Sequence, residues 1–203
     1  MIAIVDYNMG NLASVKNAFA KLGEEVSIIA DPDKFQLYDK LILPGVGAFG
    51  DAMEHLKERN MDEALKEYAK SGNYMFGICL GMQLLFESSE EFGPNNGLGL
   101  IQGKVIEFDQ SRFTHPLKVP HMGWNRMFTK EHALFEGMDE SHYLYFVHSF
   151  HALCANEAES IGKTNYGYEF TSAIARDNIL GIQPHPEKSH TNGLKILENF
   201  IKL

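Results

Sequence analysis

The sequence predicts an α/β fold in which a mainly parallel central sheet is flanked by helices and extended by additional antiparallel strands. Short apolar runs alternate with helix-period patterns in the first half of the chain, which is typical of parallel sheets. Beyond Gly97, frequent glycines separate short apolar segments, which indicates strands that are partly antiparallel. The 203 residues, 44% of them hydrophobic, suffice for one substantial core, so we expect one domain over residues 1–203.

The elements of the first half follow in a regular order. Apolar runs and apolar residues at helical spacing predict a strand over 2–6, a helix over 11–22 and strands over 26–30 and 40–44. Residues 51–70 begin with Asp51, a typical N-cap residue, and continue with apolar residues at near-helical spacing. Arg59 and Asn60 interrupt that pattern, which predicts two short helices or one kinked helix.

The second half is predicted to consist mainly of strands. Residues 104–108 and 143–147 are short apolar segments of this kind. Residues 193–203 are amphipathic at helical spacing and predict a closing helix. The loop over 88–97 is rich in Glu, Gly, Pro and Asn, so we expect it to be the most mobile element.

Cys79 lies where an apolar run meets a Gly-x-Cys-x-Gly turn and a helix-period pattern. This arrangement is typical of a nucleophile elbow, with sulfur in place of oxygen. Gly77 and Gly81 suit a strand that turns sharply into a helix, because the crowded backbone leaves no room for a Cβ atom. A position at a helix N-terminus favours the thiolate. A buried apolar cysteine is the alternative, but it would not require glycine on both sides.

A second motif surrounds His185, which lies between Pro184 and Pro186 and is followed by Glu187. A thiolate nucleophile needs an imidazole to transfer protons, and a carboxylate fixes the tautomer of that imidazole. Cys79, His185 and Glu187 therefore form a candidate catalytic set. A rigid surface turn would explain the His185 motif on its own about equally well.

With these two motifs the chain resembles the class I (triad) glutamine amidotransferase family, whose glutaminase domains carry a Gly-x-Cys-x-Gly-x-Gln elbow and a His-Pro-Glu motif. The resemblance extends over essentially the whole chain and implies the fold of that family. Pro184 is a departure, because the family usually has Phe immediately before the histidine. Three further motifs resemble one branch of the family, and they lie at 44–49, 120–125 and 145–149.

The glycine-rich loop over 44–47 follows a predicted strand, as Cys79, His185 and residues 6–11 do. Ligands of open α/β sheets bind beyond the carboxyl ends of the strands, so we expect these segments to meet at one edge. A backbone without side chains can offer N–H donors to an oxyanion. The candidate donors lie in Gly45, Val46, Gly47 and Leu80, and a tight turn that ends a strand is the less favoured explanation of the glycines.

The resemblance also implies that glutamine is the substrate. Its binding groups would come from the backbone near Gly47, from Gln83 and Glu91, and from the backbone of Ser149 and Phe150. Gln83 lies four residues after Cys79 and so shares its helix face. Alternatively, Gln83 is a solvated helical residue, and Glu91 is one member of a solvated run of charges.

In the branch that the chain resembles, ammonia passes through a tunnel to a cyclase subunit with a (β/α)₈ barrel. The resemblance therefore implies such a partner in a heterodimer. It assigns four residues to the rim and the partner interface: Asn11, Trp124, Asn125 and Lys188. Trp124, the only tryptophan, could instead belong to the core.

The global composition argues against several other classes. A net charge of −9 disfavours nucleic-acid binding, which depends on clustered Lys and Arg. Two cysteines give no disulfide framework, and Cys154 is most simply a buried strand residue. We expect no membrane span and no secretory signal, and hence a cytoplasmic protein. The nine histidines form no metal-binding motif, so we expect neither a metal nor a cofactor.

Three alternatives remain open at this stage. A related glutaminase subunit that serves another synthase, for instance one that amidinates a sugar, would share every glutaminase motif. A stand-alone cysteine hydrolase or peptidase could use the same elbow, but it would not need Gln83 and Trp124. A non-catalytic binding subunit is disfavoured, because Cys79, His185 and Glu187 are all present.

Overall fold

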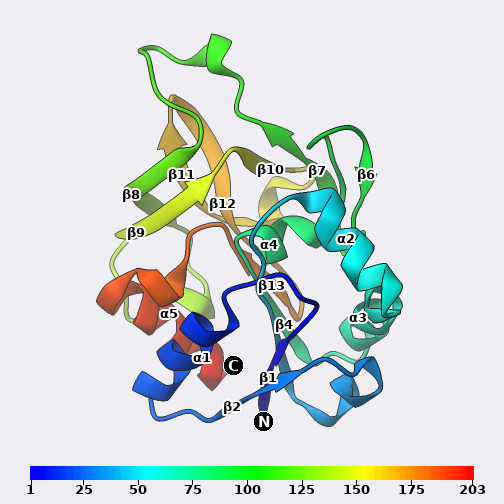
Figure 1. The fold of residues 1–203 in the computed structure, drawn as a ribbon. Coiled ribbons are helices and arrows are strands. Elements are labelled where there is room, and N and C mark those ends of the chain that lie inside the picture. Colours follow the sequence, from blue (N-terminus) through cyan, green and yellow to red (C-terminus); the bar gives the residue numbers. More distant parts are fainter.

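The computed structural model describes residues 1–203, and all of its strands belong to one mixed sheet (Figure 1). The helices and strands are β1 (Ile2–Val5), α1 (Leu12–Lys21), β2 (Val26–Ile29), η1 (Pro32–Leu37), β3 (Lys40–Leu43), α2 (Phe49–Glu58), α3 (Met61–Lys70), β4 (Tyr74–Ile78), α4 (Leu80–Leu84), β5 (Phe86–Ser89), β6 (Asn95–Asn96), β7 (Ile101–Glu107), η2 (Gln110–Arg112), β8 (His121–Thr129), η3 (Ala133–Phe135), β9 (Ser141–His148), β10 (Phe150–Cys154), η4 (Glu157–Glu159), β11 (Ser160–Tyr166), β12 (Tyr168–Arg176), β13 (Ile179–Ile182), η5 (Pro186–Lys188) and α5 (His190–Lys202).

Five neighbouring strands, in the order β2-β1-β3-β4-β13, pair in parallel, and β5 pairs in parallel with β7 near the opposite edge of the sheet. The sheet continues through β12, β10 and β7 with antiparallel pairs, and β11, β8 and β9 branch from β12. The predicted α/β class, with parallel strands, flanking helices and additional antiparallel strands, is therefore confirmed. The central strand β13 comes from the end of the chain and lies between β4 and β12.

The parallel strands separate two hydrophobic cores. Successive side chains of a strand point to opposite faces, so Leu41 and Leu43 join the core under α2 and α3, whereas Ile42 joins the core under α1 and α5. The inner strands β1, β3, β4 and β13 are buried on both faces, as is usual for a parallel sheet covered by helices. Figure 1 shows α1 and α5 on one side of the sheet and α2 and α3 on the other.

Most predicted elements are present, with ends shifted by a few residues. Two helices rather than one kinked helix occupy the region after residue 48, and Asn60 separates them in a left-handed conformation (φ 55°). The predicted N-cap role of Asp51 is wrong, because α2 begins at Phe49 and its N-cap residue is Ala48, which has no capping side chain. Instead the carboxylate of Glu91 accepts a hydrogen bond from the Phe49 amide at 2.8 Å.

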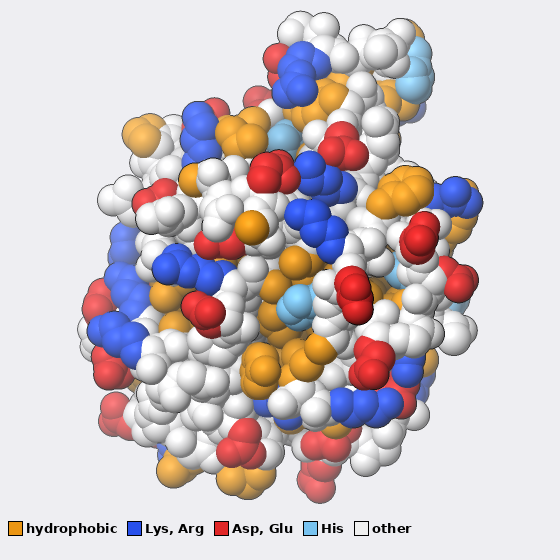
Figure 2. Space-filling view, turned by 180° about the vertical axis from the view of Figure 1, so that it is seen from behind, with side chains coloured by type: hydrophobic (Ala, Val, Ile, Leu, Met, Phe, Trp, Pro, Cys, Tyr) orange, Lys and Arg blue, Asp and Glu red, His pale blue; other side chains and the backbone are white.

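The surface mixes both signs of charge. Acidic and basic side chains are interspersed over the face drawn in Figure 2, and apolar side chains gather near its centre. None of the helices combines the length and the apolar composition that crossing a membrane requires.

Candidate active site

Cys79 occupies the turn between β4 and α4. Its backbone has φ 55° and ψ −113°, a conformation that is rare for a residue with a side chain. Its amide donates to the carbonyl of Ile182, the last residue of the neighbouring strand β13, at 2.8 Å. The elbow geometry predicted from Gly-x-Cys-x-Gly is thus present, and the end of β13 holds it in place.

The two glycines of this motif are needed because the turn packs against backbone. A Cβ atom on Gly81 would lie 1.8 Å from the carbonyl oxygen of Leu43, at the end of β3. A Cβ atom on Gly77 would lie 2.7 Å from backbone atoms of Gly81 and Met82. Any side chain at these positions would push the elbow away from the edge of the sheet.

We expect the substitution Gly81→Ala to lower the free energy of unfolding by about 3 kcal/mol or more, the upper end of the usual cost of overpacking. The reason is that the new methyl group would meet backbone atoms of Leu43, which cannot rotate away. Chemical denaturation monitored by circular dichroism measures the change. Gly72→Ala is the control, because Gly72 (φ +84°) has open space around it and should cost only about 1 kcal/mol of left-handed strain. Equal midpoints for the two variants would contradict this account.

His185 follows β13 and is held from both sides. Its Nδ1 lies 2.8 Å from Oε1 of Glu187, and both side chains are almost completely buried. The His185 amide donates to the carbonyl of Tyr145 at 2.9 Å, and its own carbonyl accepts from the Ser189 hydroxyl. Burial lowers the pKa of His185, but the Cys79 sulfur and the Glu187 carboxylate oppose burial, and the net effect is a raised pKa.

Gln183 is a site residue that the sequence motifs did not single out. It is fully buried, and its Nε2 lies 3.7 Å from the sulfur of Cys79. Its Oε1 accepts a hydrogen bond from Nε2 of Gln83 at 2.9 Å. The sequence offered one indication that Gln183 belongs to the site. It lies two residues before His185, so in an extended chain both side chains point to the same side.

A cavity of about 280 Å³ opens beside Cys79 and His185. A small molecule the size of an amino acid fits such a space. The other lining residues are Val46, Gly47, Leu80, Gln83, Glu91, Pro120, Val147, His148, Ser149 and Phe150. The structure therefore brings all five predicted glutamine-binding residues, three of the four predicted oxyanion residues, and two members of the predicted triad to one cavity.

Gln83 and Glu91 are both fixed in place. Gln83 is buried, which excludes a solvated helical role, and its Nε2 also donates to the carbonyl of Phe150 at 3.0 Å. Glu91 is half-buried and spans the space between the cavity and the first residue of α2, Phe49. Burial raises the pKa of Glu91, and the hydrogen bond from Phe49 partly offsets that effect.

The loop Pro44–Gly47 joins β3 to the N-terminus of α2. Gly45 is buried against the elbow, where a Cβ atom would lie 2.9 Å from the amide nitrogen of Gly81. It does not line the cavity. Val46 and Gly47 do line the cavity, and their amides donate to no other group of the chain. Residues 6–11 also hold the loop in place, since the Tyr7 hydroxyl donates a hydrogen bond to the Pro44 carbonyl at 2.7 Å.

The four residues assigned to the rim and interface lie outside the cavity. Asn11 caps α1 by accepting a hydrogen bond from the Ser14 amide. Trp124 is 47% exposed, which excludes a core role, and its ring stacks on His190 at 5.0 Å. Lys188 is exposed, and Asn125 bonds to His121 and to the carbonyl of Asn165.

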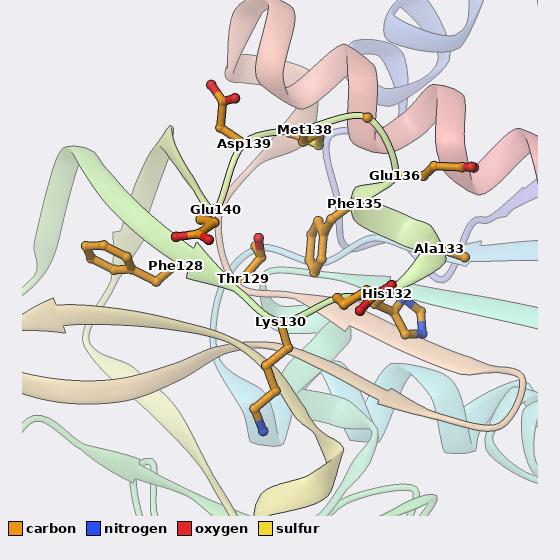
Figure 3. Close-up of a pocket in the computed structure, with 12 residues that line it drawn as sticks. Phe128, Thr129, Lys130, His132, Ala133, Phe135, Glu136, Met138, Asp139 and Glu140 are labelled. Carbon is orange, nitrogen blue, oxygen red and sulfur yellow. The ribbon is translucent and has the colours of Figure 1, made fainter.

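A larger hollow of about 780 Å³ lies away from these residues, at the connection between β8 and β9. Figure 3 shows the loop curving around it, with the Phe135 ring inside the arc and the side chains of Lys130 and Asp139 pointing away from it. None of the predicted site residues lines this hollow. The larger volume of this hollow is therefore no evidence for catalysis, and the smaller cavity beside Cys79 is the candidate active site.

Comparison with known families and proteins gives matches over essentially the whole chain. The family model "Glutamine amidotransferase class-I" matches residues 3–203. A protein of Sulfurimonas denitrificans named imidazole glycerol phosphate synthase subunit HisH is 76% identical, over 100% of this chain and 98% of its own length. A protein of the same name from Wolinella succinogenes is 56% identical, over 100% of both chains.

Solved structures share the fold at low sequence identity. A chain of PurLQS from Thermotoga maritima superposes with a TM-score of 0.77 at 18% identity and covers 99% of this chain and 97% of its own length. A structure described as a glutamine amidotransferase superposes with a TM-score of 0.76 at 17% identity and covers 100% of this chain and 98% of its own. At such identities the likeness concerns the fold alone.

Proposed function

Because this chain belongs to the class I glutamine amidotransferase family, we propose that it is the glutaminase subunit of imidazole glycerol phosphate synthase, an enzyme of histidine biosynthesis. The observation that carries the proposal is the cavity where Cys79 meets the buried pair of His185 and Glu187. The 76% identity to a HisH subunit over the whole chain supports the choice of synthase over other amidotransferases.

In the proposed reaction the Cys79 thiolate attacks the side-chain amide carbon of glutamine. A C–S bond forms, and the carbonyl oxygen becomes an oxyanion. His185 donates its proton to the amide nitrogen, the C–N bond breaks, and ammonia leaves. His185 then takes a proton from water as the water oxygen attacks the thioester, and glutamate leaves when the C–S bond breaks. Glu187 stabilises the imidazolium and, when the ring is neutral, keeps its proton on Nδ1 so that Nε2 can act as the base.

The remaining cavity residues have distinct proposed roles. The free amides of Val46 and Gly47, together with that of Leu80, are the donors for the oxyanion. Glu91 binds the α-ammonium group of glutamine, and Gln83 with the backbone of Ser149 and Phe150 holds the rest of the molecule. Gly45 contributes by letting the loop pack closely on the elbow rather than by donating a hydrogen bond.

Ammonia is the product that the synthase uses, and we propose that a cyclase subunit with a (β/α)₈ barrel receives it. That partner would form imidazole glycerol phosphate and an aminoimidazole carboxamide ribonucleotide. The proposed contact surface lies near Trp124, Lys188 and the start of α1 at Asn11. We further propose that residues 1–203 act as one amidotransferase domain in the cytoplasm, where a reducing environment keeps Cys79 as a thiol.

The free chain is expected to hydrolyse glutamine slowly, and the cyclase with its ribonucleotide ligand is expected to accelerate hydrolysis about a hundredfold to a thousandfold. This is the usual effect of gaining one oxyanion donor. The physical reason is that the Val46 and Gly47 amides have no fixed partner, and Gly47 (φ +100°) permits more than one orientation of its peptide. Ammonia release should be measured for the free chain, for the complex, and for the complex with that ligand.

Two results would contradict these expectations in different ways. A free chain that already hydrolyses glutamine at the full rate would remove the coupling and leave a constitutive glutaminase. Failure of the cyclase to bind, together with binding of a different synthase, would show that the chain is a related glutaminase subunit of another pathway. A protein that releases no ammonia from glutamine in either state would overturn the proposed function itself.

A further inference from the structure

Two buried imidazoles are not used by the proposed chemistry, that of His148, which lines the cavity, and that of His121, which does not. His121 begins β8, His148 ends β9, and the two residues are paired in the antiparallel register. Nδ1 of His121 lies 2.9 Å from Nε2 of His148, and Nδ1 of His148 lies 2.7 Å from the carbonyl oxygen of Phe150. His121 is 2% exposed and His148 is 7% exposed.

The partners of these rings determine where the protons are. Burial lowers the pKa of both histidines, that of His121 to about 4, so each imidazole is neutral and carries one N–H. The Phe150 carbonyl can only accept, so Nδ1 of His148 is the donor and its Nε2 is an acceptor. Nδ1 of His121 must then donate to His148, which leaves Nε2 of His121 as an acceptor.

Asn125 completes the chain at its outer end. Its Nδ2 lies 3.1 Å from Nε2 of His121 and 2.9 Å from the carbonyl oxygen of Asn165, so both amide hydrogens are used. Each donor in the series therefore points the same way, from Asn125 through His121 and His148 to Phe150. Aromatic rings enclose it, since His121 stacks on Tyr166 at 4.0 Å and on Phe146 at 4.7 Å.

The inner end of the series is part of the cavity wall. The Phe150 carbonyl accepts from both His148 and Gln83, so its two lone pairs are occupied. The Ser149 carbonyl accepts from the Phe108 amide at 3.1 Å, whereas the Ser149 amide donates to no group of the chain. The backbone at 149–150 is thus held with a free N–H donor beside the cavity, and Gln83 is held in the orientation that also bonds Gln183.

We propose that Asn125, His121 and His148 are positioning residues, which form a one-way series of hydrogen bonds that holds the 149–150 backbone and Gln83 in the geometry that binds glutamine. This inference rests on the proposed function for the identity of the ligand. It assigns a role to His121 and to the buried His148, which lines the cavity but has no part in the proposed proton transfers.

The first test is the substitution His148→Phe in the full chain, assayed with its cyclase partner. The Phe150 carbonyl loses one donor and Nδ1 of His121 loses its acceptor, so KM for glutamine should rise about 10- to 100-fold. We expect kcat to change by less than about threefold, because the reacting groups stay in place. His148→Asn should recover most of the loss, since its Nδ2 can replace Nδ1 as the donor to Phe150.

His142→Phe is the matched control. His142 is a buried histidine on the same strand, and the only hydrogen-bond partner of its side chain is the Thr129 hydroxyl at 3.5 Å. Its replacement should leave KM unchanged. A rise in KM that is equal for His142→Phe and His148→Phe, or the absence of any rise for His148→Phe, would overturn the proposal. If His148→Phe does not fold, Asn125→Ala, which removes the outer donor, is expected to raise KM by a smaller factor.

The second test does not depend on catalysis. In the ¹⁵N spectrum of the histidine-labelled wild-type chain at pH 7, both His121 and His148 should be neutral Nδ1–H tautomers. Either ring found as the Nε2–H tautomer or as an imidazolium would overturn the series. A chain with the expected tautomers and no glutaminase activity would instead refute the proposed function while leaving the hydrogen-bond series intact.

Discussion

Replacement of Cys79 by alanine is expected to lower glutamine-dependent synthesis by about 10⁴-fold or more, while synthesis from ammonium salts by the complex continues. The substitution removes the only sulfur among the residues that line the cavity and leaves the chemistry of the proposed cyclase partner unchanged. A methyl group is smaller than the thiol, so the elbow keeps its backbone contact with Ile182. The measurement is paired turnover of the complex with glutamine and with an ammonium salt.

Cys154→Ala provides the control for loss of a cysteine. Cys154 lies on β10 away from the cavity, and burial raises the pKa of its thiol. Turnover of that variant with glutamine should equal that of the wild type. If Cys79→Ala reduces turnover equally with glutamine and with ammonium, then Cys79 supports the structure of the complex instead of ammonia release.

His185→Asn is expected to lower kcat for glutamine hydrolysis by about 10⁴-fold. The loss of kcat for Glu187→Gln is expected to be smaller than this by a factor of about 10 to 100. Asparagine cannot shuttle a proton, whereas a glutamine at 187 still offers an oxygen to Nδ1 of His185 and loses only the negative charge. Single-turnover kinetics of the complex measure both variants. His132→Asn is the control, because His132 caps the short helix η3, far in the chain from the triad.

The order of these two effects is the decisive result. A larger loss for Glu187→Gln than for His185→Asn would mean that the carboxylate itself transfers a proton. Glutaminase activity at the wild-type rate in His185→Asn would remove His185 from the mechanism.

Local sequence patterns predicted the parallel half of the fold well because each strand there is a short apolar run that ends at a polar or glycine-rich loop. β1, β3 and β4 could be found this way, and the rule that ligands bind at the carboxyl ends of strands placed Cys79 near the 44–47 loop. The Asp51 prediction failed for a physical reason. The N-cap residue is Ala48, three residues earlier, and a carboxylate from a distant loop, Glu91, accepts a hydrogen bond from the first amide of the helix.

The candidate site was predicted as far as its residues carry recognisable motifs. Cys79, His185 and Glu187 lie in such motifs, and the structure brings them together. The contacts of Gln183, the burial of Gln83 and the series that ends at Phe150 were not predictable. Each depends on contacts between residues of segments far apart in the sequence, and tertiary packing rather than local pattern determines which of these residues meet.

The position of β13 between β4 and β12 has a consequence for how the protein matures. Gln183 and Cys79 are 104 residues apart, and β4 has no neighbour on one edge until residues 179–182 arrive. Such long-range parallel pairing forms late, because a long loop must close before its contacts form. A ribosome that delivers the chain from its N-terminus therefore releases Cys79 well before His185. On the proposed mechanism, a chain that still lacks residues 179–185 would have the nucleophile without its base and would not hydrolyse glutamine.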